Sequence, residues 1–219
     1  MAALRINTTA AVALFGFAMP MAIRAEVIDR IAIVVGRQVI TASQIDTEVR
    51  VTAFLSGQSK PAVTDTLKRE AAARLIEQTL VRREIELTRF PTPKSEETKP
   101  LFEQAMRIHG DNFASALREA GLSEDDLNQH LLWQLTLLRF VQYRFQPSVS
   151  VADNEIRDLY NQESARLRGE GKPTPPFEEA RKDLEALLTE RHVDEALERW
   201  LVEQRGQTAI VFKVKELAP

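Results

Sequence analysis

Both ends of the chain favour β-strands, whereas almost everything between them has the apolar spacing of helices. Residues 27–35 (VIDRIAIVV) and 39–41 (VIT) are rich in β-branched residues and flank a turn at 36–38, which is typical of a hairpin. Residues 209–214 (AIVFKV) are a third short β-prone run. Because an isolated hairpin is only marginally stable in water, we expect this last run to pair with the first two. One domain would then close on itself.

Helical periodicity, capping residues and Gly or Pro stops predict about seven helices between these runs. We expect Thr41, Ser123 and Ser150 to be N-caps, and Asp111 to cap a short helix that ends at Gly121. The other expected helices cover about 42–55, 64–88, 96–108, 124–145, 150–168 and 177–204. The predicted fold class is therefore mainly α, a core of about seven helices with a small sheet formed by an N-terminal β-hairpin and a C-terminal strand.

The helix expected at 124–145 has apolar residues around most of its circumference, so we expect it to be the most buried.

Residues 1–25 have the features of a secretory signal peptide rather than of a folded segment. Arg5 gives a positively charged start, 10–19 (AAVALFGFAM) are continuously apolar, and Ala25 is the best residue before a cleavage site. An uncleaved anchor is the alternative, although ten apolar residues are too few to span a bilayer, which needs about 20 in a helix. No later segment is long and apolar enough to cross a membrane. We therefore expect cleavage after Ala25 and a periplasmic protein that does not span the membrane.

Composition and motifs exclude much chemistry. Lys+Arg 29 against Asp+Glu 32 gives a net charge of -3, which offers no electrostatic basis for binding nucleic acid. The chain has no cysteine, hence no disulfide, thiol nucleophile or Cys-ligated metal. It also contains no glycine-rich phosphate loop and no GxSxG. We expect no catalytic site, no cofactor and no nucleotide.

The three histidines are scattered along the chain. His109, His130 and His192 have no metal-ligand spacing around them, so no metal site is expected. His109 lies at the end of a predicted helix, where a partial positive charge is favourable. His130 follows Asp126 by one helical turn, close enough for a hydrogen bond. Structural or solvent-facing roles are expected for these side chains.

Apolar side chains near short helices are the remaining candidates for a binding site. Phe54 and Leu55 end the first predicted helix, and Phe102, Met106 and Phe113 come from short helices that follow. They are either core residues or the lining of a groove for extended apolar segments, to which Met and aromatic rings supply adaptable contacts. The sequence alone does not distinguish the two.

Several stretches resemble SurA-type periplasmic chaperones. The start, VIDRIAIVVGRQVITASQID (27–46), resembles that family's N-terminal signature. LIEQTLV (75–81) resembles part of its second helix, and ALERWLVEQRGQTAIVFK (196–213) is similar to its C-terminal helix and strand, which pair with the N-terminal hairpin. Residues 121–145 and 149–162 resemble the two intervening helices.

The resemblance implies one SurA-like chaperone domain, made of 26–168 and 177–219. The family carries parvulin-type prolyl isomerase domains where this chain has only 169–176 (GEGKPTPP), a linker by composition. Because even a small domain needs about 50 residues, we expect no enzyme activity.

The function implied is ATP-independent binding of unfolded outer-membrane proteins and their delivery to the outer-membrane assembly machinery. Residual prolyl isomerase activity and a periplasmic adaptor with a single partner are the alternatives.

Overall fold

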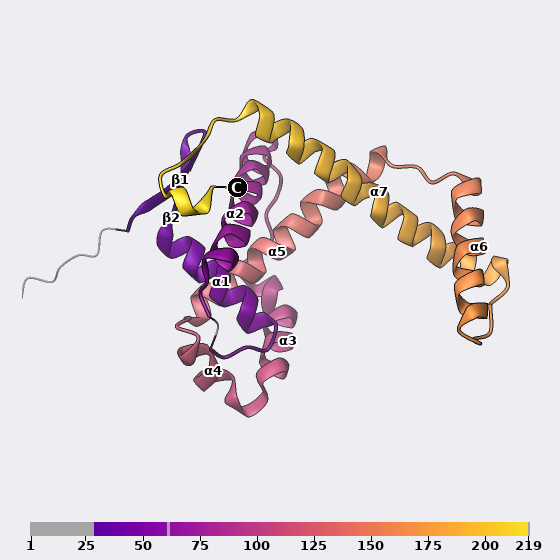
Figure 1. The fold of residues 1–219 in the computed structure, drawn as a ribbon, viewed down its shortest axis with the longest axis horizontal. Helices are drawn as coiled ribbons and strands as arrows, with labels where there is room; N and C mark the ends of the chain where they lie inside the picture. The colour runs from indigo at the N-terminus through magenta and orange to yellow at the C-terminus, as the bar shows by residue number, and fades with distance from the viewer. Residues whose placement is uncertain (1–28, 61, 219) are drawn as a thin grey trace, which may run out of the picture.

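The computed structural model describes residues 29–60 and 62–218, and these form a mainly helical fold with a small antiparallel sheet (Figure 1). The predicted signal peptide and its cleavage after Ala25 lie outside the described residues. The sheet, α1 to α5 and the end of α7 make up a body. The rest of α7 runs out of this body to α6, and we call α6 with the N-terminal half of α7 the arm.

The sheet joins the two ends of the described chain. Its strands are β1 (Ile31–Val35), β2 (Gln38–Thr41) and β3 (Ile210–Phe212), in the order β2-β1-β3. β1 pairs antiparallel with both neighbours, and Ile33 lies opposite Phe212. The turn between β1 and β2 needs Gly36, whose φ of 59° lies in the left-handed region. The predicted pairing of the C-terminal strand with the hairpin is thus confirmed.

α1 (Ala42–Leu55) and α2 (Asp65–Thr88) pack against each other and against the sheet. Thr41 caps α1 as expected, and the Gln44 side chain accepts a hydrogen bond from the Thr41 N–H at 2.9 Å. Together these elements bury a first cluster, which includes Ile33 and Ile45.

α3 (Lys99–His109) and α4 (Phe113–Glu119) pack with the end of α1 around a second cluster. The N-cap of α4 is Asn112 rather than the expected Asp111. The reason is that a single 3-10 turn, Gly110–Asn112, fills the space between the two helices and includes Asp111.

α5 (Glu124–Phe145) has the expected bounds and links two clusters. Ser123 caps it, and the Ser123 hydroxyl accepts a hydrogen bond from the Asp126 N–H at 3.1 Å. Its N-terminal half contributes to the second cluster, and its C-terminal half packs with α2 and α7 in a third. The helix is not buried on all sides, because Leu138 and Tyr143 are 55% and 65% exposed.

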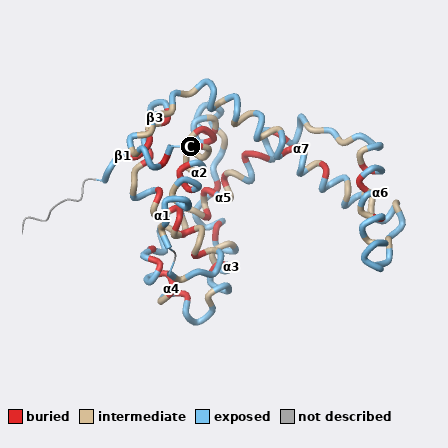
Figure 2. Tube along the Cα trace, viewed as in Figure 1, coloured by how far each residue is buried: buried red, intermediate tan, exposed pale blue. Residues whose placement is uncertain are grey.

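α6 (Asp153–Gly169) and α7 (Phe177–Gln207) form the arm and its connection to the body. The N-cap of α6 is Ala152, not Ser150, because the Glu155 carboxylate accepts a hydrogen bond from the Ala152 N–H at 2.7 Å. α7 continues through Gly206 instead of ending before it. The arm has its own small cluster, centred on Ile156 and Leu188. Figure 2 shows that buried residues are concentrated in the body and sparse in the arm.

Removing residues 208–219 should destabilise the body. β1 would lose its partner on one side, and the first cluster would lose Leu217, which is 8% exposed. Because replacing even one buried Leu by Ala costs about 2–5 kcal/mol, we expect the midpoint of thermal unfolding to fall by many degrees. Removal of residues 218–219 alone is the control and should change little. An unchanged midpoint after the longer truncation would contradict the role of β3.

Candidate functional site

Two of the apolar residues predicted to line a groove, Phe54 and Phe113, are buried in this structure. Phe54 is 0% exposed and Phe113 is 6% exposed, and their rings meet edge to face with centroids 5.7 Å apart. The His109 ring stacks on Phe54, and its Nε2 lies 2.8 Å from the Phe54 carbonyl oxygen. Phe54 and Phe113 are therefore core residues.

Two of the other three predicted residues pack against the same cluster. Leu55 and Phe102 are half-buried against it, and the Phe102 ring meets Phe113 with centroids 5.5 Å apart. Met106 alone is substantially exposed, at 44%. Four of the five side chains thus belong to one packed cluster, because the apolar sides of α3 and α4 face α1 and α5.

Substitutions at Phe54 and Met106 should separate core from surface. Phe54→Ala should cost about 3–5 kcal/mol of stability because it leaves a cavity in the second cluster. Met106→Ser should stay within about 0.5 kcal/mol because the side chain is exposed. Chemical denaturation monitored by helicity measures both. Equal effects would contradict this assignment.

A cleft lies between α1, α2 and α5, and one end of it lies under α7. Of the five predicted residues, only Leu55 lines this cleft. It consists of two adjoining cavities that share Glu48, Gln78, His130 and Trp133. The cavity near the edge strand β2 has a volume of about 400 Å³, and the cavity under α7 has a volume of about 480 Å³. This cleft is the candidate functional site.

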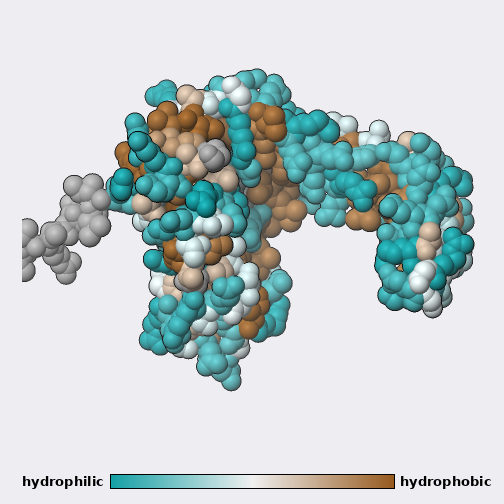
Figure 3. Space-filling model, viewed as in Figure 1, coloured by the Kyte–Doolittle hydropathy of each residue, from teal (hydrophilic) through white to brown (hydrophobic). Residues whose placement is uncertain are grey.

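The two cavities differ in chemistry. Apolar side chains from four helices line much of the cavity under α7, which we call the apolar cavity: Leu55, Val81, Trp133, Leu137, Leu197 and Leu201. In the cavity beside β2, which we call the amide cavity, four glutamines contribute: Gln38, Gln44, Gln78 and Gln129. Figure 3 shows apolar surface where α5 and α7 meet, next to the bend between body and arm.

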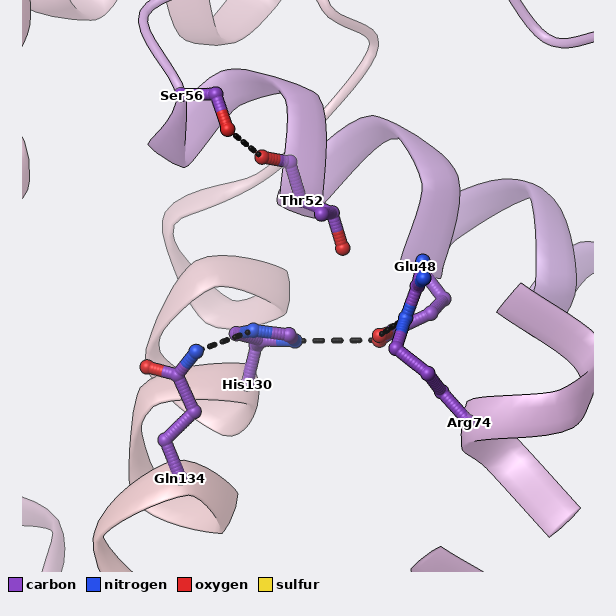
Figure 4. A network of polar contacts seen from close by, with 6 residues as sticks. All are labelled: Glu48, Thr52, Ser56, Arg74, His130 and Gln134. Atoms are coloured by element: carbon purple, nitrogen blue, oxygen red, sulfur yellow. Dashed lines mark hydrogen bonds and ion pairs between the residues drawn. The ribbon is translucent and has the colours of Figure 1, made fainter. Parts of the chain in front are cut away.

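A polar network lies where the two cavities meet (Figure 4). The Glu48 carboxylate, 8% exposed, accepts a hydrogen bond from Arg74 Nε at 3.3 Å and lies 3.2 Å from His130 Nδ1. The Gln134 side-chain nitrogen lies 3.0 Å from His130 Nε2. Because an amide nitrogen only donates, Nε2 accepts, which leaves the Nδ1 proton for Glu48. The network joins α1 to α2 and α5.

The Glu48 carboxyl is held in its ionised form. Burial by itself raises its pKa, but the hydrogen bonds from His130 and Arg74 and the positive charge of Arg74 outweigh burial and lower the pKa below 4.5. The nearby Ser56 hydroxyl donates to the Thr52 carbonyl oxygen at 3.0 Å rather than to His130. Both ring nitrogens of His130 are thus occupied by side chains, and the arrangement ties helices together.

The sequence did not reveal this network. His130 was expected to pair with Asp126, one turn away, but the Asp126 carboxylate accepts hydrogen bonds from the Ser123 N–H and hydroxyl. The residue that His130 does pair with, Glu48, is 82 residues away in the sequence. The one local signal was a charged residue at an otherwise inward-facing position of α1, between buried Ile45 and Val51. His192 lies 3.3 Å from Glu155, which links α7 to α6.

No protein-family model matches the chain, and no curated protein matches it either. Within residues 29–60 and 62–218, no cluster of three or more His, Asp or Glu side chains is arranged to hold a metal ion. No helix in the same described ranges is long and apolar enough to cross a membrane.

The stability contributed by Glu48 should depend on pH. Its pKa is lower in the folded protein than the ordinary 4.5, so the stabilisation is fully present above about pH 4.5 and is lost as pH falls through the folded pKa. Near neutral pH, Glu48→Gln should lower the free energy of unfolding by about 1–3 kcal/mol, as for hydrogen bonds to charged groups. The difference from wild type should shrink as the pH falls below 4.5.

Denaturation at a series of pH values measures this difference. Glu163→Gln is the control, since Glu163 pairs with Arg166 on an exposed face of α6, where an ion pair contributes little. A Glu48→Gln penalty that stays constant from neutral to strongly acid pH would contradict the ionised network.

Proposed function

We propose that the chain is an ATP-independent periplasmic chaperone of the SurA type, which binds unfolded outer-membrane polypeptides and delivers them to the outer-membrane assembly machinery. The observation that carries the proposal is the apolar cavity of about 480 Å³ between α1, α2, α5 and α7. A cavity of this kind accommodates the apolar side chains that an unfolded polypeptide exposes.

The resemblance of 27–46 and 196–213 to the SurA-type family supports the proposal, and so does the fold. An N-terminal hairpin paired with a C-terminal strand is the arrangement expected from that resemblance. α6 is followed directly by α7, and the Tyr160 hydroxyl donates to the Pro175 carbonyl oxygen at 2.8 Å. The connection is therefore short and attached to the arm, so we expect binding without prolyl isomerase activity.

The arm adds a second surface to the proposed binding region. α6 and the N-terminal half of α7 hold each other through their own cluster, and the arm projects beside the body (Figure 1). Leu187 on α7 and Leu138 on α5 are 46% and 55% exposed. An unfolded chain that enters the apolar cavity therefore finds further apolar contacts nearby, each weak and reversible. Release by mass action needs no nucleotide.

The purified protein should suppress aggregation of an unfolded outer-membrane barrel protein at near-stoichiometric ratio and without ATP. Leu197→Ser places a hydroxyl in the apolar cavity and should weaken this protection several-fold. Val202→Ser is the matched control on the same helix, because Val202 is 71% exposed and is not among the residues that line the cavity. Light scattering measures aggregation, and circular dichroism checks that both variants keep their helicity.

Two outcomes would contradict the proposal. If the protein protected no unfolded barrel protein from aggregation, the chaperone function would be contradicted. A single stoichiometric partner in pull-downs would then favour an adaptor. Acceleration of cis–trans conversion in a prolyl peptide would identify an isomerase, and it would be easily seen because the uncatalysed reaction takes tens of seconds or more.

A further inference from the structure

Trp133 lies at the centre of the cleft. The residue is 5% exposed, and it lines the amide cavity, the apolar cavity and a third cavity of about 350 Å³. The third cavity lies on the other side of Arg82 and also includes Thr92 and Pro93. The Arg82 guanidinium carbon lies 3.9 Å from the centroid of the Trp133 ring. A stacked Arg–Trp pair therefore separates the amide cavity from the third one.

Two arginines line the cleft, and they differ in their partners. Arg74 pairs with Glu48, whereas Arg82 makes no ion pair with a described residue. Burial lowers the pKa of Arg82, and the nearby charge of Glu86 offsets this in part. The residue keeps an exposed surface. A guanidinium stacked on one face retains the N–H donors at its edge for another acceptor.

The surroundings of the pair suit an extended polypeptide. Gln78 and Gln129 line the amide cavity with Arg82, and their amide groups match those of a peptide backbone. β2 is an edge strand whose residues also line this cavity. Val35 and Gln38 close the hairpin, so Val39, at the next position, directs its N–H and C=O away from β1. An extended chain can pair with these groups.

We propose that Arg82 and Trp133 form a subsite for the carboxylate of an Asp or Glu side chain within an extended client segment, next to the apolar cavity. The positive charge of Arg82 supports an acidic side chain, because the two carboxylates that also line the amide cavity, Glu48 and Asp126, already accept hydrogen bonds from Arg74 and Ser123. Cavities on both sides of the pair favour an internal acidic residue over a C-terminal carboxylate, since the chain has room to continue in either direction. This inference rests on the proposed function and makes its substrate class more specific, as segments that combine apolar and acidic residues.

Short labelled peptides test the subsite on the purified protein. The first carries one Phe and, two positions later, one Glu, so that both side chains lie on the same face of an extended chain. The second replaces Glu by Gln, and both have acetylated and amidated ends. The third is the Gln peptide with a free C-terminal carboxylate. Fluorescence anisotropy measures each Kd for wild type, Arg82→Gln and Arg83→Gln.

We expect the Glu peptide to bind wild type about tenfold more tightly than the Gln peptide, a difference of about 1.4 kcal/mol. Arg82→Gln should abolish this difference. Arg83→Gln should retain it, because Arg83 is the next residue on the same helix but lines none of the three cavities beside Trp133. The preference should also weaken as salt is raised. If Arg82→Gln fails to fold, Arg82→Lys replaces it in this test, because lysine keeps the positive charge but lacks the planar guanidinium that binds a carboxylate with two hydrogen bonds.

The outcomes distinguish this inference from the proposed function. Equal binding of the Glu and Gln peptides to wild type would overturn the subsite while leaving chaperone activity in place. A preference only for the free C-terminus would overturn the internal acidic residue as the ligand. Loss of the preference in Arg83→Gln as well as Arg82→Gln would assign it to general charge. Failure of all peptides to bind, together with no protection against aggregation, would overturn both proposals.

Discussion

The pairing of β3 with β1 determines the path of the rest of the chain. β1 is the central strand, and its hydrogen bonds to β3 bring residues 210–212 back to the hairpin at 31–41. α7 must therefore return from the arm across α2 and α5 to reach the sheet. This return places Leu197 and Leu201 over the cleft and turns an open gap into the apolar cavity. Strand pairing at one end of the molecule thus shapes the candidate site.

Along part of their length, α2 and α5 are held together through α1 and α7, and the cleft lies in the gap that this leaves between them. α1 and α7 each pack against both helices. Near the C-terminal end of α2, Val81 and Ile85 meet Trp133 and Phe140 in the third cluster. Closer to the N-terminal end of α5, the gap contains Glu48, His130 and two cavities. An ionised carboxylate at this point resists collapse of the gap into a dry core, because burying it further would cost the hydrogen bonds that stabilise its charge.

The cleft has an apolar and a polar part close to each other, and Trp133, which is stacked with Arg82, lines both. One side offers leucines and the other offers glutamines and a guanidinium. A surface built only of leucines would bind any apolar chain, whereas a cation beside an apolar cavity favours segments with both features. In the proposed chaperone, the chemistry of the cleft would therefore bias which client segments bind.

Most of the local structure was predictable from the sequence because it depends on neighbouring residues. The box of Thr41 with Gln44 and that of Ser123 with Asp126 set the starts of α1 and α5, and the bounds of both helices agree with the prediction. Where a predicted N-cap was wrong, a neighbouring turn or side chain forms the start of the helix instead. Asp111 was absorbed into a 3-10 turn, and Glu155 satisfied the start of α6 in place of Ser150.

The sequence by itself determined the helices and the hairpin, because periodicity, caps and turns act over a few residues. It also predicted the return of a C-terminal strand, because an isolated hairpin is only marginally stable. The tertiary structure alone decided which apolar side chains are buried, since Phe54 and Met106 look alike in the sequence but are 0% and 44% exposed. It also decided the partners of His130 and Arg82. Glu48 and Trp133 lie far from them in sequence, and only the packing of α1, α2 and α5 brings these groups together.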